Sequence, residues 1–136
     1  MNTTNTKIAI PAQEIASDTT TLGEIIDLQD VEMVTFAAAI ADFTDGTYQF
    51  VVEHGEDSGL SDAADVDVTD QIRGNLYNTA IAPSADNRVY RFQLLKFKRF
   101  ARLKVISAGT TVGTFLSATA ELMRLRGSLA NDQNVA

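Results

Sequence analysis

The sequence contains no cysteine and no tryptophan, and it has only two prolines and a single histidine, His54. Without cysteine the chain has no disulfide, no thiolate nucleophile and no cysteine-ligated zinc, and it is compatible with a reducing compartment. No apolar run is long enough to cross a bilayer, and residues 1–13 lack the basic and apolar segments of a signal peptide. We therefore expect neither a membrane span nor a membrane partner.

Basic residues are almost absent from the first half of the chain. Residues 1–72 carry fifteen acids and one base, Lys7, for a formal charge of −14, whereas residues 73–136 carry ten bases and three acids, for a formal charge of +7. Because the net charge is −7, we expect no nucleic-acid partner for the whole molecule. The split predicts that acidic surface on one copy meets basic surface on another, which favours ordered assembly over catalysis.

Apolar and polar residues alternate along several short segments, as they do in half-buried β-strands. The pattern predicts strands over residues 24–28, 32–41, 47–53, 88–95, 100–107 and 114–125. Alanine is frequent in 32–41, so a helix is the alternative there, but its β-branched residues and phenylalanine favour a strand. Asp45-Gly46 supplies a tight turn, which predicts a hairpin over residues 32–53.

Short strands separated by turns, with no long helical pattern, predict an all-β fold. We expect an antiparallel β-sandwich, jelly-roll-like, with a small barrel as the alternative. A chain of 136 residues is expected to form one domain. Residues 1–23 are expected to form an extended N-terminal arm that packs on a neighbouring subunit, residues 24–126 the sandwich, and residues 127–136 a short flexible tail.

Residues 54–70 are rich in acids and are expected to form a solvated surface loop. Four of these acids are closely spaced: Asp62, Asp65, Asp67 and Asp70. Their oxygen atoms suit calcium, but the segment lacks the glycine and glutamate positions of an EF-hand loop. We therefore expect no metal, with weak calcium binding as the alternative. His54 has no histidine or cysteine partner, so it is expected to be an exposed loop residue.

A second cluster carries bases interleaved with Phe97 and Phe100. Its bases are Lys96, Lys98, Arg99, Arg102 and Lys104. Such a pattern can stack on and neutralise single-stranded nucleic acid, but the outer face of a half-buried strand explains the same alternation and is favoured. The chain has no recognised arrangement of serine, histidine and acid and no phosphate-binding glycine spacing. We therefore expect no enzymatic activity, no catalytic residue and no cofactor.

Several short segments resemble small structural proteins of tailed-bacteriophage virions, most of all head decoration (capsid cement) proteins. These segments are residues 23–28, 34–36, 44–50, 98–105 and 107–111. The resemblance covers about residues 23–125 and includes no site motif. It implies a β-sandwich or jelly roll that forms a homotrimer, binds the phage major capsid protein on the outside of the shell and locks neighbouring capsid subunits. It also implies a place on the virion surface after synthesis in the host cytoplasm.

The residues expected to make these contacts are chosen by charge. A basic face is expected from Arg88, Arg91, Arg99, Arg102 and Lys104, and an acidic rim from Asp57, Asp62, Asp65 and Asp67. One alternative is a tail, neck or fibre-associated virion module. Another is a carbohydrate-binding β-sandwich that uses exposed Tyr48, Tyr77 or Tyr90.

Overall fold

The computed structural model of the chain describes residues 2–66 and 70–125. The strands are β1 (Asn2–Ile15), β2 (Thr19–Leu22), β3 (Ile26–Asp27), β4 (Met33–Ile40), β5 (Thr47–Gly55), β6 (Ala64–Asp65), β7 (Ile72–Arg73), β8 (Arg88–Leu94), β9 (Phe100–Ala108) and β10 (Thr114–Leu125). A short 3-10 turn, η1 (Pro83–Ala85), precedes β8. The prediction of an all-β fold is confirmed.

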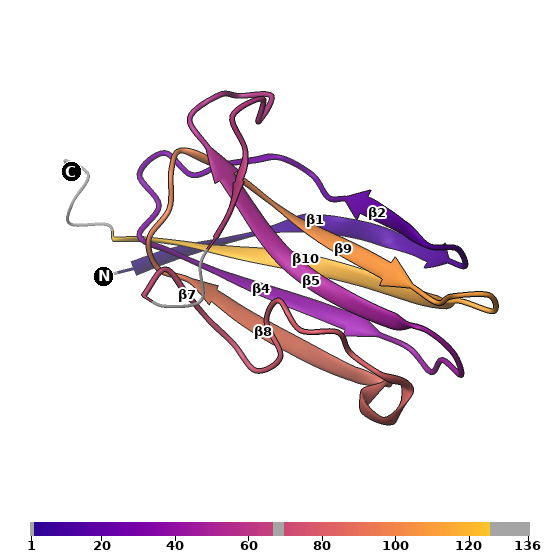
Figure 1. The fold of residues 1–136 in the computed structure, drawn as a ribbon. Helices are drawn as coiled ribbons and strands as arrows, with labels where there is room; N and C mark the ends of the chain where they lie inside the picture. Colours follow the sequence, from indigo (N-terminus) through magenta and orange to yellow (C-terminus); the bar gives the residue numbers. More distant parts are fainter. Residues whose placement is uncertain (1, 67–69, 126–136) are drawn as a thin grey trace.

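The strands form two antiparallel sheets (Figure 1). Sheet A has the order β1-β10-β4-β8-β7, and sheet B has the order β2-β9-β5-β6, with β3 also paired to β9. One hydrophobic core takes side chains from both sheets. Its largest members include Phe36, Phe92 and Leu122 from sheet A and Tyr48, Phe50 and Leu103 from sheet B. The rings of Phe50 and Phe92 lie 6.0 Å apart between centroids and join the two layers.

Consecutive long strands lie in opposite sheets: β4, β8 and β10 belong to sheet A, whereas β5 and β9 belong to sheet B. The predicted hairpin over residues 32–53 is therefore wrong, because β4 pairs with β10 and β8, and β5 pairs with β9 and β6. Residues 41–46 cross between the layers. The apolar faces of β4 and β5 consequently point into one core from opposite sides.

Residues 1–23, predicted to form an extended N-terminal arm that packs on a neighbouring subunit, join the sheets of their own molecule where the structure describes β1 and β2. β1 pairs with β10 from Asn2↔Leu125 to Ile15↔Thr114, and β2 pairs with β9. The polar residues at the start of β1 suggested a free segment, but a β-ladder is held by backbone groups and needs no apolar side chains. Farther along β1, Ala9, Ile10 and Ile15 are buried in the core. The predicted flexible tail, 127–136, lies outside the described residues.

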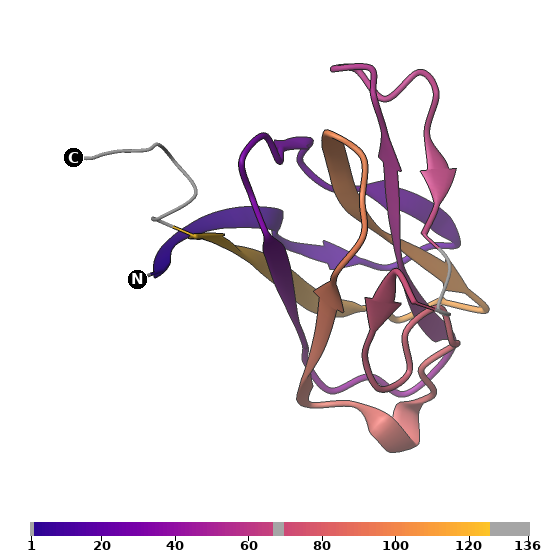
Figure 2. The ribbon, with the colours of Figure 1, turned by 90° about the vertical axis from the view of Figure 1, so that its left-hand side faces the viewer.

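The loop between β5 and β6 projects at the top of Figure 2 and is ordered by two of its own acids. Asp62 accepts hydrogen bonds from the backbone N–H groups of Glu56 and Asp57, at 2.9 and 3.2 Å. Asp57 accepts from the N–H groups of Gly59 and Ser61, at 2.9 and 3.2 Å. These bonds lower the pKa values of both carboxyl groups because they stabilise the charged forms. Both acids therefore shape the loop.

Candidate interaction surfaces

Four charged side chains form a network on the outer face of sheet B, here called the Glu53 cluster: Glu53, Asp65, Arg102 and Lys104. Arg102 Nε lies 2.5 Å from Glu53 Oε1, and Lys104 Nζ lies 3.4 Å from Glu53 Oε2 and 2.9 Å from Asp65 Oδ1. The strand register produces this geometry, since Glu53 pairs with Arg102 on β9 and with Asp65 on β6. The cluster thus joins three strands of sheet B.

The Glu53 cluster is largely shielded from water, although it lies on an outer face. The side chain of Glu53 is 9% exposed and those of Arg102 and Lys104 are 17% and 15% exposed. Burial disfavours the charged form of Lys104, but the hydrogen bond to Asp65 and the charge of Glu53 outweigh burial and raise the pKa of Lys104. Val51 lies opposite Lys104 in the ladder and is fully buried. Long basic side chains commonly cover apolar surface in this way.

The charge split of the sequence is resolved in part inside one molecule. Each ion pair among the described residues joins an acid from residues 1–72 to a base from residues 73–136. Beyond the Glu53 cluster, Arg99 binds Asp27 at 3.0 Å and Lys96 binds Asp70 at 2.6 Å. The hydrogen bonds from Arg99 lower the pKa of Asp27. Four of the five bases of the 96–104 run are therefore engaged by acids of the same chain.

The five bases predicted to form one basic face are divided between the sheets. Arg91 lies on the outer face of sheet A, and Arg88 begins the same strand. Arg102 and Lys104 lie on the outer face of sheet B, and Arg99 precedes β9. Because the outer faces of two packed layers point in opposite directions, the prediction of a single basic face is wrong.

The described acids of the predicted acidic rim all lie on the sheet B side, in the loop between β5 and β6 and on β6 itself. Asp57 and Asp62 hold the loop between β5 and β6, whereas Asp65 binds Lys104. Asp67 lies outside the described residues. Within residues 2–66 and 70–125, no group of three or more histidine, cysteine or acidic residues is placed to hold a metal ion.

His54 is buried at the end of β5, so the prediction that it is an exposed loop residue is wrong. The extended strand carries its side chain to the core face, opposite Ala101. Its Nδ1 accepts a hydrogen bond from the backbone N–H of Lys98 at 3.2 Å. Burial is the largest cause that lowers the pKa of His54, and the charge of Lys98 adds to it, while the charges of Glu56 and Asp62 oppose it.

Acidification through the titration range of His54 is expected to destabilise the fold. Because folding lowers its pKa, the unfolded chain binds the proton more readily, so the stabilisation is complete above the ordinary pKa of 6.5 and is lost as pH falls below it. The aspartates with lowered pKa values lose their stabilising contribution only in more acidic solution. We expect urea unfolding to show that the free energy of unfolding falls less between about pH 7.5 and pH 5 in His54→Asn than in the wild type. The asparagine amide oxygen can still accept the hydrogen bond from Lys98 N–H. An equal loss in both proteins would contradict this role.

The three tyrosines proposed for carbohydrate binding are buried: Tyr48, Tyr77 and Tyr90. The Tyr48 hydroxyl donates to Ile15 O at 2.9 Å, and the Tyr77 hydroxyl donates to Val66 O at 3.0 Å. Tyr90 donates to Ala85 O. A sugar-binding platform built on these exposed rings is therefore contradicted, because their faces pack in the core and their hydroxyls serve as structural donors.

The outer face of sheet A carries exposed apolar residues that the sequence analysis missed, and they share this face with Arg91, which lies beside Ala37, and with Glu121, which lies beside Thr35. Since Phe36, Ala118 and Ala120 point into the core, the alternating positions point outward. These outward positions include Thr35, Ala37 and Ala39 on β4 and Ser117 and Thr119 on β10. Large apolar residues surround this floor of small side chains: Ile8 is 61% exposed, Val89 51% and Phe115 62%. The sequence did contain a signal: the outward positions of β4 carry small residues, whereas the outward positions of a solvated strand usually carry charged ones.

The turn between β9 and β10 leads into sheet A and carries a further large apolar residue, Val112, which is 65% exposed. Asp18 accepts a hydrogen bond from Thr110 N–H at 2.7 Å, and Asp45 accepts from Thr111 N–H at 3.1 Å and from the Thr111 hydroxyl. The Thr111 hydroxyl bond is the largest cause that lowers the pKa of Asp45. Val112 is therefore held in place by acids from two other loops. We call Ile8, Val89, Val112 and Phe115, with the floor between them, the apolar face.

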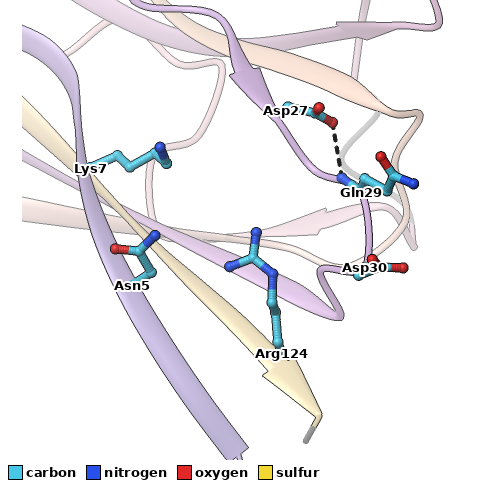
Figure 3. Close-up of a pocket in the computed structure, with 6 residues that line it drawn as sticks. All are labelled: Asn5, Lys7, Asp27, Gln29, Asp30 and Arg124. Atoms are coloured by element: carbon cyan, nitrogen blue, oxygen red, sulfur yellow. Dashed lines mark hydrogen bonds between the residues drawn. The ribbon is translucent and has the colours of Figure 1, made fainter. Parts of the chain in front are cut away.

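A polar cleft of about 350 Å³ opens at the end of the molecule where β1 begins and β10 ends (Figure 3). One wall carries Asn5, Lys7 and Arg124 from these two strands, and the other carries Asp27, Gln29 and Asp30 from β3 and the following turn. Asn5 and Lys7 pair with Leu122 and Ala120, so they point to the core side of sheet A. The cleft is thus a continuation of the space between the sheets.

The chain matches no known protein family, no curated protein and no solved structure. In the described part of the chain, no helix has the length and hydrophobicity to cross a membrane.

Proposed function

We propose that this chain is a structural protein of a tailed-phage virion. It forms a homotrimer of jelly-roll-like sandwiches, binds the outside of the head and cements neighbouring major capsid subunits. The apolar face is the observation that carries this proposal, and the resemblance of the short segments to head decoration proteins supplies the biological setting. The expected location is the capsid surface, reached after synthesis in the host cytoplasm.

The apolar face has the chemistry of a protein-binding surface. Exposed large apolar residues grouped on one face mark contact sites, and small floor residues such as Ala37 and Ala39 allow another backbone to approach closely. The ladders on both sides of β4 and the bonds that fix Val112 reduce the entropy lost on binding. A contact repeated over a symmetric shell needs only modest affinity, because multivalent attachment multiplies it.

Several of the described acids support a structural role because they hold backbone or base partners. Asp18, Asp45, Asp57 and Asp62 accept hydrogen bonds from backbone N–H groups, and Glu53 binds two bases. We infer no catalytic activity and no cofactor.

Replacing Phe115 by asparagine is expected to weaken shell binding with little effect on folding. The ring is 62% exposed in the free protein, so its burial in a contact would contribute about 1.5 kcal/mol, which corresponds to about tenfold in affinity. Co-sedimentation with parent heads that lack the protein measures this. Thr20→Asn, on the exposed strand β2 of sheet B, is the control. Equal binding by both variants would remove the apolar face from the contact.

Imaging tests the place of the protein independently of any variant. A cryo-EM map of the parent particle is expected to show it on the outside of the head, over junctions between capsid subunits. Density at the neck, tail or fibres would overturn the capsid assignment in favour of another virion module.

A further inference from the structure

We propose that the polar cleft binds the Asp27–Asp30 turn of a second copy of this chain. This inference rests on the proposed homo-oligomer and names the residues that join its subunits. The turn, here called the lip, forms one wall of its own cleft and would enter the cleft of a neighbour.

The cationic wall of the cleft has no ion-pair partner in the described part of the molecule, although the charge of Arg124 helps to lower the pKa of Asp27 on the opposite wall. Among the described residues, neither Lys7 nor Arg124 forms an ion pair with a carboxylate. Figure 3 shows the side chains of Lys7, Asn5 and Arg124 extending from two adjacent strands toward the same space. An ammonium, a guanidinium and an amide together provide a donor set for a carboxylate.

The lip supplies the matching charge. Asp30 is exposed and forms no ion pair with a described base, and its φ of 65° places it at the tip of a tight turn. The turn is held by hydrogen bonds from Val31 N–H to Leu28 O at 3.1 Å and from Gln29 N–H to Asp27 Oδ1 at 3.1 Å. Its carboxylate is therefore presented on an ordered turn.

The two walls form no ion pair with each other, because each is anchored on its own side of the opening. Glu32 N–H binds Met123 O at 2.8 Å and Arg99 binds Asp27, so the lip is tied at both ends. A second copy can supply each wall with the opposite charge at once. The lip and the cationic wall are different patches, so contacts between the lip of one copy and the cationic wall of the next that repeat around a rotation axis close a ring such as a trimer.

The acidic wall also indicates which anion the cleft accepts. Asp27 and Asp30 repel a polyanion. A lip, whose Asp27 is already paired with Arg99, presents only the Asp30 carboxylate to the cationic wall and meets less opposition. Each copy carries a net charge of −7, so two copies repel each other overall and must be joined by local complementarity.

Charge reversal and charge exchange test the contact. Sedimentation equilibrium of the full chain at low salt, about 50 mM, would compare a reversed wall (Lys7→Glu with Arg124→Glu), a reversed lip (Asp30→Lys) and the three substitutions combined. Each reversal is expected to weaken association by at least about tenfold, and the combination is expected to restore much of it, because the attraction is re-formed with opposite signs. Arg73→Glu, an exposed position on β7, is the control; it changes the net charge by the same amount as either single substitution of the wall.

The outcomes separate this contact from the proposed function. Reversed variants that assemble like the wild type would overturn the lip-to-cleft contact while leaving a homo-oligomer in place. A wild-type chain that stays monomeric at all concentrations would overturn the homo-oligomer as well. Thermal melts check folding, and a neutral wall (Lys7→Gln with Arg124→Gln) that keeps full association would also contradict the proposal.

Discussion

Replacing Glu53 by glutamine is expected to lower the free energy of unfolding by about 3 kcal/mol. The carboxylate lies between Arg102 and Lys104, and its side chain is only 9% exposed. Glutamine has nearly the same shape but no charge, so two largely buried cations would lose their shared counter-ion and repel each other. Asp65, with a side chain 56% exposed, compensates Lys104 alone.

Urea unfolding at neutral pH measures this loss, and the Lys96–Asp70 pair provides a control. Both of its side chains are 65% exposed, so Asp70→Asn is expected to cost less than about 1 kcal/mol. A second test replaces Glu53, Arg102 and Lys104 together by methionine, which removes the charges while keeping apolar volume over Val51. This variant is expected to be more stable than Glu53→Gln. A loss below about 1 kcal/mol for Glu53→Gln would contradict the counter-ion role.

Replacing Gly23 by alanine is expected to destabilise the protein by about 3 kcal/mol, or to prevent folding. Gly23 lies where the chain passes between the edges of the two sheets. Its N–H donates to Leu103 O at 2.8 Å, and the next N–H, of Glu24, donates to Ala9 O at 2.8 Å. A β-carbon at Gly23 would overlap the carbonyl oxygens of both acceptors. The backbone would have to move away from β1 and β9 and would weaken both bonds.

Gly59→Ala is the matched control for Gly23→Ala, because its β-carbon would meet only Asp57 Oδ2, at 3.3 Å, on an exposed loop. Its effect is expected to stay within about 1 kcal/mol. Thermal and urea unfolding compare the two variants. If Gly23→Ala were as stable as Gly59→Ala, the closeness of the strands at Gly23 would not be needed for folding.

The charge split illustrates how far composition alone can lead. It predicted that acidic surface on one copy would meet basic surface on another, whereas the strand register brings several of these charges together within one chain. Glu53 and Arg102 are 49 residues apart in sequence and face each other across β5 and β9. Composition cannot distinguish a pair within one molecule from a pair between two. The apolar face was missed because it consists of residues that neighbouring strands leave uncovered, and the sequence does not report which strands are neighbours.

The position of His54 shows the same limit on a smaller scale. It follows the predicted strand 47–53 and precedes a run of acids, so the local sequence indicated a loop. In the structure β5 continues to Gly55, and pairing with β9 carries His54 to the core face. The partner strand decided where the strand ended, which local composition does not report.

The sequence by itself determined the class of the fold and the inward face of most long strands, because alternation with a period of two is a property of each segment alone. The segments predicted over 32–41, 88–95, 100–107 and 114–125 correspond closely to β4, β8, β9 and β10. Only the tertiary structure decided which strands pair, that residues 2–15 join sheet A, and which polar and apolar groups share a surface. Pairing depends on contacts between distant segments, whose backbone groups are alike in every residue, so the choice rests on how all the apolar faces close one core together.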